Sequence, residues 1–351
     1  MLNLPLLRQH LVDRLITARK HPTADFWIYN YSPVVQYEKR WDAVTMQCRG
    51  LILDAQYNIM ARPFQKFFNI EEMPADAIPD EPFEVYEKLD GSLGILYWLD
   101  NAPFISTRGS FMSEQAGRGT QMLHSRYAHT FANLHRDRTY LFEIIYPQNK
   151  IVVNYGDRED LILLAVIDNE TGQDYPLDDY AGLGFPVVKR FTGLSALDKL
   201  KSDADNPTND NSEGYVVRFA GGLRIKVKFA EYVRLHRIVT GVSNIAIWEY
   251  LSQGRNFAEV LDRVPDELYD WVRQVQGDLL TRYAAIETEA QAAFAAFDFT
   301  ADHTRKDVAL YFQTQRYPAI LFKLLDGGDY GPIIWKHIRP AFSKSYWKEV
   351  E

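Results

Sequence analysis

The property that most limits how this 351-residue chain can fold is a change of pattern near residue 233. Before that point, short apolar runs rich in β-branched and aromatic residues alternate with turn signals, as expected for strands. After it, apolar residues recur every three or four positions, which is typical of amphipathic helices. The pattern predicts an α+β fold: a mixed, largely antiparallel β-sheet domain with flanking helices over residues 1–235, then a mainly helical domain over 236–351.

The same periodicities predict the individual elements. Helices are expected over residues 6–20, where His21-Pro22 ends the spacing, over 113–135, around 304–315 and 318–325, and along a stripe from Leu268 to Ile286. Strands or strand-like segments are expected at 26–31, 48–54, 60–69, 104–110, 140–145, 150–153, 161–167, 214–219 and 223–229. Residues 202–213 form a polar loop.

Composition excludes several classes of protein. With 46% hydrophobic residues, the chain is globular rather than disordered. A single cysteine, Cys48, excludes an intramolecular disulfide, and eight scattered histidines argue against a dedicated zinc site. The net charge of −8 argues against indiscriminate nucleic-acid binding, although a local basic face can coexist with it. Neither a signal peptide nor a membrane-spanning run is visible, so we expect a cytoplasmic monomer without a membrane partner.

The segment Glu87–Ser92 lies between two strand-like runs, 83–86 and 93–98. Its Asp90-Gly91 pair is a turn signal, so the segment is expected to join the two runs as a hairpin. Lys88, at a strand end, would then lie partly buried. Desolvation and a neighbouring cation both favour the neutral amine, which is the nucleophilic form of lysine. The alternative is an exposed hairpin turn without a chemical role.

Strand alternation divides residues 224–229 between two faces. The apolar members Ile225, Val227 and Phe229 would enter the core, and the cations Arg224, Lys226 and Lys228 would share the opposite face. Such a row could bind phosphates, because charge-assisted contacts to phosphate are strong. The alternative is an ordinary half-buried strand with a solvated basic face.

Two carboxylates stand out beside apolar strands. Glu143 interrupts the run 141–145, where an unpaired carboxylate is costly. Glu213 precedes the strand that begins at Gly214, and its alternative interpretation is an exposed strand-end residue. Together with the lysines, these groups could accept a nucleoside triphosphate. Lys88 would attack the α-phosphorus, while Mg²⁺ and the lysines would neutralise the departing pyrophosphate.

These motifs, in this order and spacing, resemble the covalent nucleotidyltransferases, which comprise ATP-dependent ligases and mRNA capping enzymes. Within that superfamily the chain most resembles the RNA ligase 1 family typified by phage T4, over roughly residues 25–235. The residues that carry the resemblance are Tyr29-Asn30-Tyr31, Cys48-Arg49-Gly50, Arg62-Pro63, Lys66-Phe67-Phe68-Asn69, Lys88, Asp90-Gly91-Ser92-Leu93, Arg108-Gly109-Ser110, Phe142-Glu143, Glu213-Gly214-Tyr215-Val216, Lys226, Lys228 and Tyr232.

The resemblance implies a role for each of these residues. Lys88 would become adenylated, Glu143 would bind the ribose, and Glu213, with Asp90, would act near a Mg²⁺ or Mn²⁺ ion, with Glu213 acting through water. The ATP contacts that the resemblance implies are Lys226 and Lys228 on the α-phosphate and pyrophosphate, Arg49 and Lys66 on the triphosphate, Arg108 where the phage enzyme has lysine, and Tyr29 and Phe68 around the nucleotide. Tyr232 matches a tyrosine that is important in the family.

The activity that the resemblance implies is ATP-dependent RNA ligation. AMP would pass from Lys88 to an RNA 5′-phosphate, and an RNA 3′-hydroxyl would then displace it. Such an enzyme would serve RNA repair, with a broken tRNA as one candidate substrate, and the helical domain would select the RNA.

Three alternatives are weighed against this hypothesis. A capping guanylyltransferase or a DNA ligase usually appends an oligonucleotide-binding β-barrel after the last lysine motif, whereas the pattern here turns helical. A non-catalytic RNA-binding protein on a decayed ligase scaffold should have lost Lys88 or a carboxylate, and both kinds of residue are present.

Overall fold

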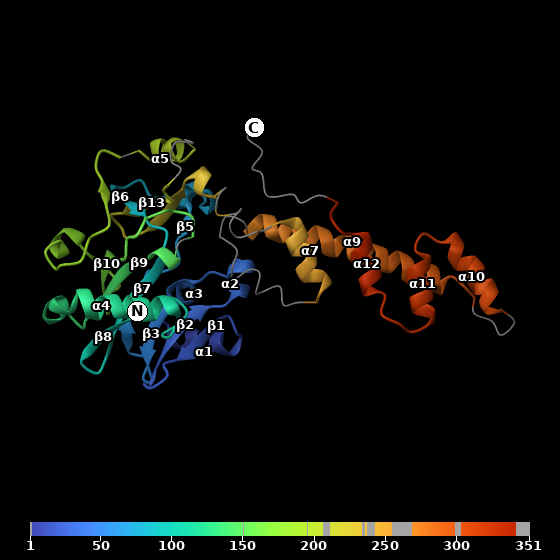
Figure 1. The fold of residues 1–351 in the computed structure, drawn as a ribbon, viewed down its shortest axis with the longest axis horizontal. Helices are drawn as coiled ribbons and strands as arrows, with labels where there is room; N and C mark the ends of the chain where they lie inside the picture. Colours follow the sequence, from blue (N-terminus) through green and yellow to red (C-terminus); the bar gives the residue numbers. More distant parts are fainter. Residues whose placement is uncertain are drawn as a thin grey trace. The chain divides into compact units, whose positions relative to one another are not determined.

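A computed structural model gives the fold of the chain (Figure 1). The structure describes residues 2–149, 151–194, 196–205, 211–233, 236, 243–254, 269–298 and 303–341. By its internal contacts the chain divides into two compact units, Met1–Val239 and Thr240–Glu351. Each unit has hydrophobic clusters of its own.

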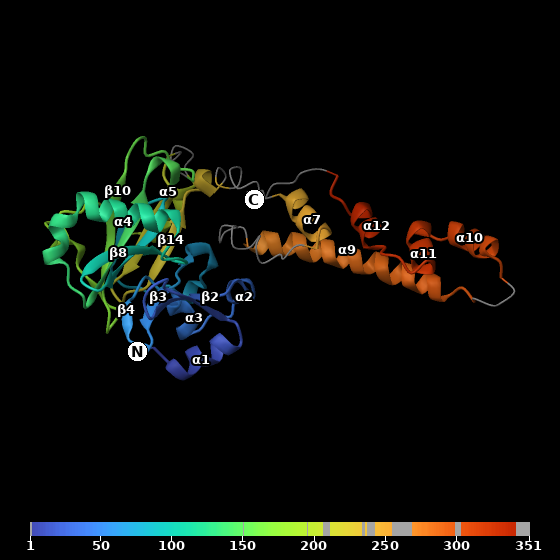
Figure 2. The same cartoon turned by 60° about the horizontal axis from the view of Figure 1, so that its bottom comes forward.

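Unit 1 is built from three β-sheets, which Figure 2 shows from a second side. Sheet A has the order β1 (Ile16–Lys20), β2 (Phe26–Tyr31), β3 (Arg49–Asp54), β4 (Ile59–Ala61). Sheet B has the order β12 (Arg190–Phe191), β6 (Phe83–Lys88), β13 (Gly214–Phe219), β14 (Arg224–Lys228), β5 (Phe68–Asn69). Sheet C has the order β11 (Asp174–Tyr175), β10 (Asp160–Asp168), β9 (Arg138–Ile145), β7 (Ser92–Leu99), β8 (Ala102–Thr107). Apart from β14 with β5, the described strand pairs are antiparallel, which confirms the predicted fold class.

Short helices and turns surround these sheets. The α-helices of unit 1 are α1 (Leu4–Val12), α2 (Pro33–Tyr37), α3 (Ala43–Gln47), α4 (Glu114–Arg126) and α5 (Leu197–Ala204). The 3₁₀ turns are η1 (Ile70–Glu72), η2 (Ala75–Ala77), η3 (Ala128–Asn133), η4 (Pro147–Asn149) and η5 (Leu177–Tyr180). The side chains of Ser113, at the start of α4, and Asp42, at the start of α3, accept backbone N–H groups, which satisfies donors that a helix leaves unpaired.

Strand β9 shows how the core positions the later site. Its Tyr140 and Phe142 are fully buried in the cluster beneath α4, and Leu141 faces the opposite cluster, where sheets A and C meet. Because strand side chains alternate, Glu143 lies on the face of Leu141, as the sequence predicts, and away from α4.

The expected hairpin at Lys88 is wrong. Strand β6 pairs with β13 in sheet B, whereas β7 pairs with β9 in sheet C, so the segment between them crosses from one sheet to another. The turn signal at Asp90-Gly91 was read correctly as a break in the strands. The partner of each strand could not be predicted, because pairing depends on residues at least 46 positions away.

Three other predicted elements are wrong in extent or type. The strand-like segment predicted over 60–69 is irregular over 62–67, and its ends belong to β4 in sheet A and β5 in sheet B. The helix predicted over residues 6–20 ends at Val12, because Arg14 takes a left-handed backbone angle (φ 58°) and residues 16–20 then pair with β2. The predicted strand 150–153 is irregular over residues 151–153, and residue 150 lies outside the described residues. The N–H groups of Val152 and Val153 bond to the Asp90 carboxylate instead of a ladder.

The described part of unit 2 is helical, as predicted. Its helices are α7 (Asn244–Ser252), α9 (Tyr269–Ala295), α10 (Arg305–Thr314), α11 (Pro318–Leu325) and α12 (Gly331–His337). Phe312, Ile320, Leu321 and Ile334 are fully buried at their centre. Leu268, the first residue of the predicted stripe, lies outside the described residues, as do positions 206–210 of the predicted polar loop. Among the helices described, none is both long and apolar enough to cross a bilayer.

Candidate active site

Lys88 lies at the end of β6, where strand register brings three positions into one row. Gly214 pairs with Lys88 on one side and with Lys228 on the other. Paired side chains point to the same face of a sheet, so the two lysines face the same way with a glycine between them. A Cβ at Gly214 would lie 2.1 Å from the Val227 carbonyl oxygen, at a backbone φ of 146°, which explains why this position is glycine.

Glu213 binds both lysines. Its Oε1 lies 2.6 Å from Lys88 Nζ and 3.1 Å from Lys228 Nζ, and the residue is 4% exposed. Burial alone would raise the pKa of Glu213, but the charges and hydrogen bonds of the two lysines outweigh burial and lower that pKa. The result is an ionised carboxylate between two ammonium groups. The Lys88 side chain is partly buried, as the sequence predicts.

Glu143 approaches the same place from sheet C. Its Oε1 accepts a hydrogen bond of 2.9 Å from Gly91 N. Burial raises the pKa of Glu143 to about 8, against the opposing effect of the Lys88 charge. A Cβ at Gly91 would lie 2.7 Å from the Ile144 carbonyl oxygen, so glycine is required for this close approach. Sequence reasoning placed Glu143 near Lys88, and the structure brings the two together.

The cations of β14 share one face, as predicted, but their surroundings differ. Ile225 and Val227 are fully buried on the other face. Lys226 is 9% exposed, and its Nζ lies 5.6 Å from the centre of the Phe67 ring. Arg224 differs from both lysines, because it donates to the Asp174 carboxylate at 3.1 Å and so belongs to a separate ion pair.

A second group of cations lies on aromatic rings. Lys66 is 4% exposed, and its Nζ lies 5.2 Å from the Phe68 ring centre and 5.4 Å from that of Trp41. The Arg108 guanidinium lies 5.6 Å from the Tyr31 ring centre and donates to its hydroxyl at 3.2 Å. Tyr31 and Trp41 meet edge to face at 4.9 Å, so the rings connect the two cations.

Backbone pairing places this second group beside the other strands. Phe68 pairs with Ile225, the neighbour of Lys226. Arg49 pairs with Asn30, whose side-chain amide donates to the Arg108 carbonyl oxygen at 2.8 Å. Arg49 and Arg108 therefore belong to neighbouring segments, although 58 positions separate them in the sequence.

The structure places Tyr29, which was predicted to line the nucleotide pocket, in the hydrophobic core beside sheet A. Tyr29 is 5% exposed and packs with Val44, Cys48 and Leu51, among the residues that join sheet A to α1 and α3. Alternation along β2 turns its neighbour Asn30 the other way, and Asn30 and Tyr31 contact Arg108 instead. The motif Tyr29-Asn30-Tyr31 alone does not show which of its residues face Arg108. That depends on how sheet A packs against its neighbours.

The structure places the carboxylate of Asp90, a predicted metal ligand, among three hydrogen-bond donors. Asp90 is 3% exposed, and one carboxylate oxygen accepts hydrogen bonds of 2.8 Å from Val152 N and Val153 N. The other oxygen accepts a hydrogen bond of 2.8 Å from the Tyr232 hydroxyl. Three donors occupy most of the acceptor sites of a carboxylate, so Asp90 ties its own segment to Val152, Val153 and Tyr232, and its role toward a metal stays a prediction.

The same bonds give Tyr232 a position that its motif did not reveal. It is 3% exposed, and its ring lies 5.3 Å from Lys228 Nζ. Tyr232 therefore connects the segment after β14 to the segment after Lys88.

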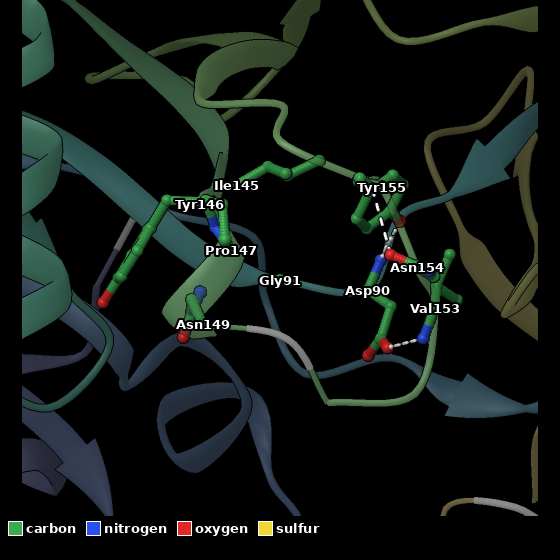
Figure 3. Close-up of a pocket in the computed structure, with 10 residues that line it drawn as sticks. Asp90, Gly91, Ile145, Tyr146, Pro147, Asn149, Val153, Asn154 and Tyr155 are labelled. Atoms are coloured by element: carbon green, nitrogen blue, oxygen red, sulfur yellow. Dashed lines mark hydrogen bonds between the residues drawn. The ribbon is translucent and has the colours of Figure 1, made fainter.

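Residues of another segment also meet the Lys88 segment, and sequence reasoning missed them. A cavity of about 180 Å³ opens beside Gly91, and Figure 3 shows Asp90 and Tyr155 on its wall. The Tyr155 hydroxyl accepts a hydrogen bond of 2.8 Å from Asp90 N. Nothing in one sequence distinguishes this tyrosine from the twenty others in the chain.

Comparison with protein families gives one match over most of unit 1. A family model described as RNA ligase, of the T4 RNA ligase 1 type, matches residues 47–233, which is more than half of the chain. The match contains Lys88, Glu143, Glu213, Lys226 and Lys228.

Individual relatives are more distant. An Autographa californica nuclear polyhedrosis virus protein, provisionally named bifunctional polynucleotide kinase/RNA ligase, is 27% identical over 257 residues, which cover 65% of this chain and 36% of that protein. An RNA ligase of Rhodothermus phage RM378 is 24% identical over 292 residues, with 62% of this chain and 66% of that protein covered. The chain thus spans less than two thirds of the length of these relatives.

Among solved structures, a Naegleria gruberi RNA ligase with ATP and manganese covers 45% of this chain and 52% of its own, with 20% identity and a TM-score of 0.36. At these values the likeness is weak.

Proposed function

The chain belongs to the RNA ligase family of the T4 RNA ligase 1 type, and we propose that it is an ATP-dependent RNA ligase that joins RNA 3′-hydroxyl and 5′-phosphate ends. The observation that carries this proposal is the pairing of Lys88 Nζ with Glu213 Oε1 at 2.6 Å, with Lys228 3.1 Å from the same oxygen. This contact fixes the position of the Lys88 amine, within the part of the chain that matches the family, as a nucleophile requires.

The first step of the proposed reaction begins with loss of a proton from the Lys88 ammonium. Nζ then attacks the α-phosphorus of ATP, a nitrogen–phosphorus bond forms, and the bond to pyrophosphate breaks. Because its pKa is lowered, Glu213 is a weak base, and its role is to orient Nζ while the proton passes to solvent. Lys228 and Lys226 would stabilise the charge of the phosphates.

Two further transfers complete the proposed cycle. The RNA 5′-phosphate attacks the phosphorus of lysyl–AMP and releases Lys88, giving an RNA 5′-adenylate. The RNA 3′-hydroxyl then attacks that 5′-phosphate, loses its proton, and displaces AMP. Glu143, which Gly91 N holds beside the Lys88 segment, is proposed to bind the ribose.

The residues present fit a Mg²⁺ or Mn²⁺ ion that is bound largely by the substrate. In the part of the chain that the structure describes, no cluster of three or more His, Cys, Asp or Glu side chains could hold a metal. Mg²⁺ commonly binds one or two carboxylates together with phosphate oxygens and water, and Glu213 would contribute through water in that way. When bound, the metal would neutralise charge on the leaving pyrophosphate.

The decisive test of this function is mass spectrometry of the purified protein after incubation with ATP and Mg²⁺. We expect an added AMP on Lys88, and joining of a nicked RNA with 5′-phosphate and 3′-hydroxyl ends. Absence of both products would refute the proposed function. AMP transfer without ligation of any defined RNA would restrict the proposal to the first step.

ATP is expected to be the nucleotide used, rather than GTP or NAD⁺. The family membership motivates this choice, and the sequence lacks a Gly-rich dinucleotide fingerprint. With radiolabelled nucleotides at equal concentration, we expect ATP to label Lys88 at least about tenfold faster than GTP, as for a site that binds one base by hydrogen bonds. Equal labelling by the two nucleotides would contradict this prediction.

We also propose that the helical unit selects the RNA, with a broken tRNA among the candidates. Its exposed cations Lys323, Lys336 and Arg339 could contact phosphates, and a solvated surface is the alternative. The residues proposed for nucleotidyl transfer all precede Thr240, where the second unit begins.

Removal of residues 240–351 is expected to separate the two activities. A folded truncated protein should still form lysyl–AMP, and joining of a structured RNA should fall by at least about tenfold relative to a single-stranded RNA, because phosphate contacts add to affinity. Circular dichroism and gel filtration would establish that the truncated protein is folded. A folded protein without lysyl–AMP, or one that joins structured RNA at the full rate, would contradict the division.

A further inference from the structure

The path of the chain at Lys88 raises a structural question. Lys88 is the last residue of β6 in sheet B, and β7 begins at Ser92 in sheet C. The residues between them therefore have no strand ladder of their own. Contacts with another part of the chain must hold this crossing segment, because a nucleophile needs a defined position.

The segment Val152–Tyr155 supplies those contacts. The N–H group of Val152 bonds to one oxygen of Asp90 at 2.8 Å. Val153 N donates to the same oxygen, and the Tyr155 hydroxyl accepts the Asp90 N–H, each at 2.8 Å (Figure 3). Tyr155 also packs against the hydrophobic cluster that contains Leu89, which is 6% exposed. The segment therefore binds both residues that follow Lys88, through backbone, side chain and apolar contact.

The same segment is bound on its other side to the chain before Glu213. Asn154 N donates to Asn211 Oδ1 at 2.7 Å, and Asn211 Nδ2 donates to Asn154 O at 3.1 Å. The Asn211 side chain thus pairs with both backbone groups of Asn154. Asn211 precedes Glu213 by two positions, so one segment of four residues contacts the neighbours of Lys88 and the approach to Glu213.

We propose that Val152–Tyr155 is a bridge that positions the Lys88 amine against the Glu213 carboxylate, with Tyr155 and Asn211 as its positioning residues. The expected effect of the bridge on lysyl–AMP formation rests on the proposed function. Its expected effect on the position of Lys88 in the free protein rests on geometry alone. Neither residue touches the reacting atoms. Each would act through the 2.6 Å contact between Lys88 and Glu213.

Two variants of the full-length protein test the bridge. Tyr155→Phe removes the acceptor of the Asp90 N–H and keeps the ring against the cluster that contains Leu89. Asn211→Ala removes the pair of bonds to Asn154 at an exposed position. Asn211→Asp keeps an oxygen that can accept the Asn154 N–H and loses only the donor to Asn154 O. Its effect should therefore be smaller than that of Asn211→Ala.

Each variant has a matched control. Tyr140→Phe also removes a hydroxyl that accepts a backbone N–H, from His135 at 3.1 Å, at a fully buried site beneath α4. Asn101→Ala removes an exposed asparagine whose Oδ1 accepts from Arg136. These controls measure what the loss of a similar hydrogen bond does elsewhere in the fold.

The first measurement is independent of ATP. A brief pulse of acetic anhydride is applied to each protein, and mass spectrometry gives the acetylation of Lys88 relative to the exposed Lys20. Loss of the bridge should loosen the Lys88 contact to Glu213 and raise Lys88 labelling about fivefold, as expected for the loss of one hydrogen bond. Labelling equal to that of the controls would overturn the inference.

The second measurement is the rate of lysyl–AMP formation in a single turnover, as a function of ATP concentration. Both variants should lower the maximal rate about tenfold and leave the half-saturating ATP concentration within about twofold, because positioning acts on the reaction step. A changed half-saturation with an unchanged maximal rate would overturn the positioning role. If wild-type protein forms no lysyl–AMP, the proposed function fails, and the acetylation result still decides whether the bridge exists.

Discussion

Lys88→Ala is expected to abolish formation of the covalent AMP adduct, with a loss of at least about 10³-fold, the order found when a covalent nucleophile is removed. Lys88→Arg should fail equally, although it keeps the positive charge beside Glu213. A guanidinium remains protonated in proteins, so it has no lone pair for attack on phosphorus. Transfer of radiolabelled AMP from ATP measures both variants.

Controls for this prediction separate chemistry from folding. Lys20→Ala removes an exposed lysine, paired with Asp25 at 2.8 Å, and should label like the wild type. Both Lys88 variants should still join an RNA that is supplied as its 5′-adenylate, because that step needs no lysyl nucleophile. Robust labelling of Lys88→Ala at another lysine would show that the nucleophile has been wrongly assigned.

Glu213→Gln is expected to have the second-largest effect, and it should act on both activity and stability. The substitution removes the negative charge that two lysines share at 2.6 and 3.1 Å. Removing one member of a buried ion pair costs about 3 kcal/mol, because the remaining charge stays buried. We expect lysyl–AMP formation to fall by about 10²-fold, as for the loss of an electrostatic contact at the reacting group.

The pH dependence of stability gives an independent measurement of Glu213. Its folded-state pKa lies below the ordinary value of 4.5, so the stabilisation is complete above that value and is lost as the pH falls through the lower, folded pKa. Urea denaturation of wild type and Glu213→Gln should therefore differ most near neutral pH. The difference should shrink in acid.

Asp174→Asn is the matched control for Glu213→Gln. Asp174 is also a carboxylate that two cations share, Arg218 at 3.4 Å and Arg224 at 3.1 Å. The Asp174→Asn protein should be less stable than the wild type, without a comparable loss of AMP transfer. If Asp174→Asn and Glu213→Gln reduce AMP transfer equally, the effect of Glu213 is only structural and its proposed role is wrong.

Local pattern determined much about this protein. Period-two alternation placed Ile225 and Val227 in the core and the neighbouring lysines on the other face, because successive strand side chains must point to opposite sides. The same rule placed Glu143 apart from Phe142, and the change of period near residue 233 predicted the helical unit. The ordered motifs also indicated the family, which the match over residues 47–233 confirms.

Tertiary structure alone decided which segments meet. The sequence pattern predicted a hairpin over residues 83–98, whereas β6 pairs with β13 and β7 pairs with β9. The pairing is determined by distant hydrophobic faces rather than by the turn. The motif does not reveal that Val152, Val153 and Tyr232 donate to the Asp90 carboxylate, because those donors come from distant segments. Tyr155 and Asn211 have no local pattern, because each acts through a hydrogen bond to a segment more than 50 positions away. Contacts of that range depend on how the sheets pack, and only the folded chain reveals them.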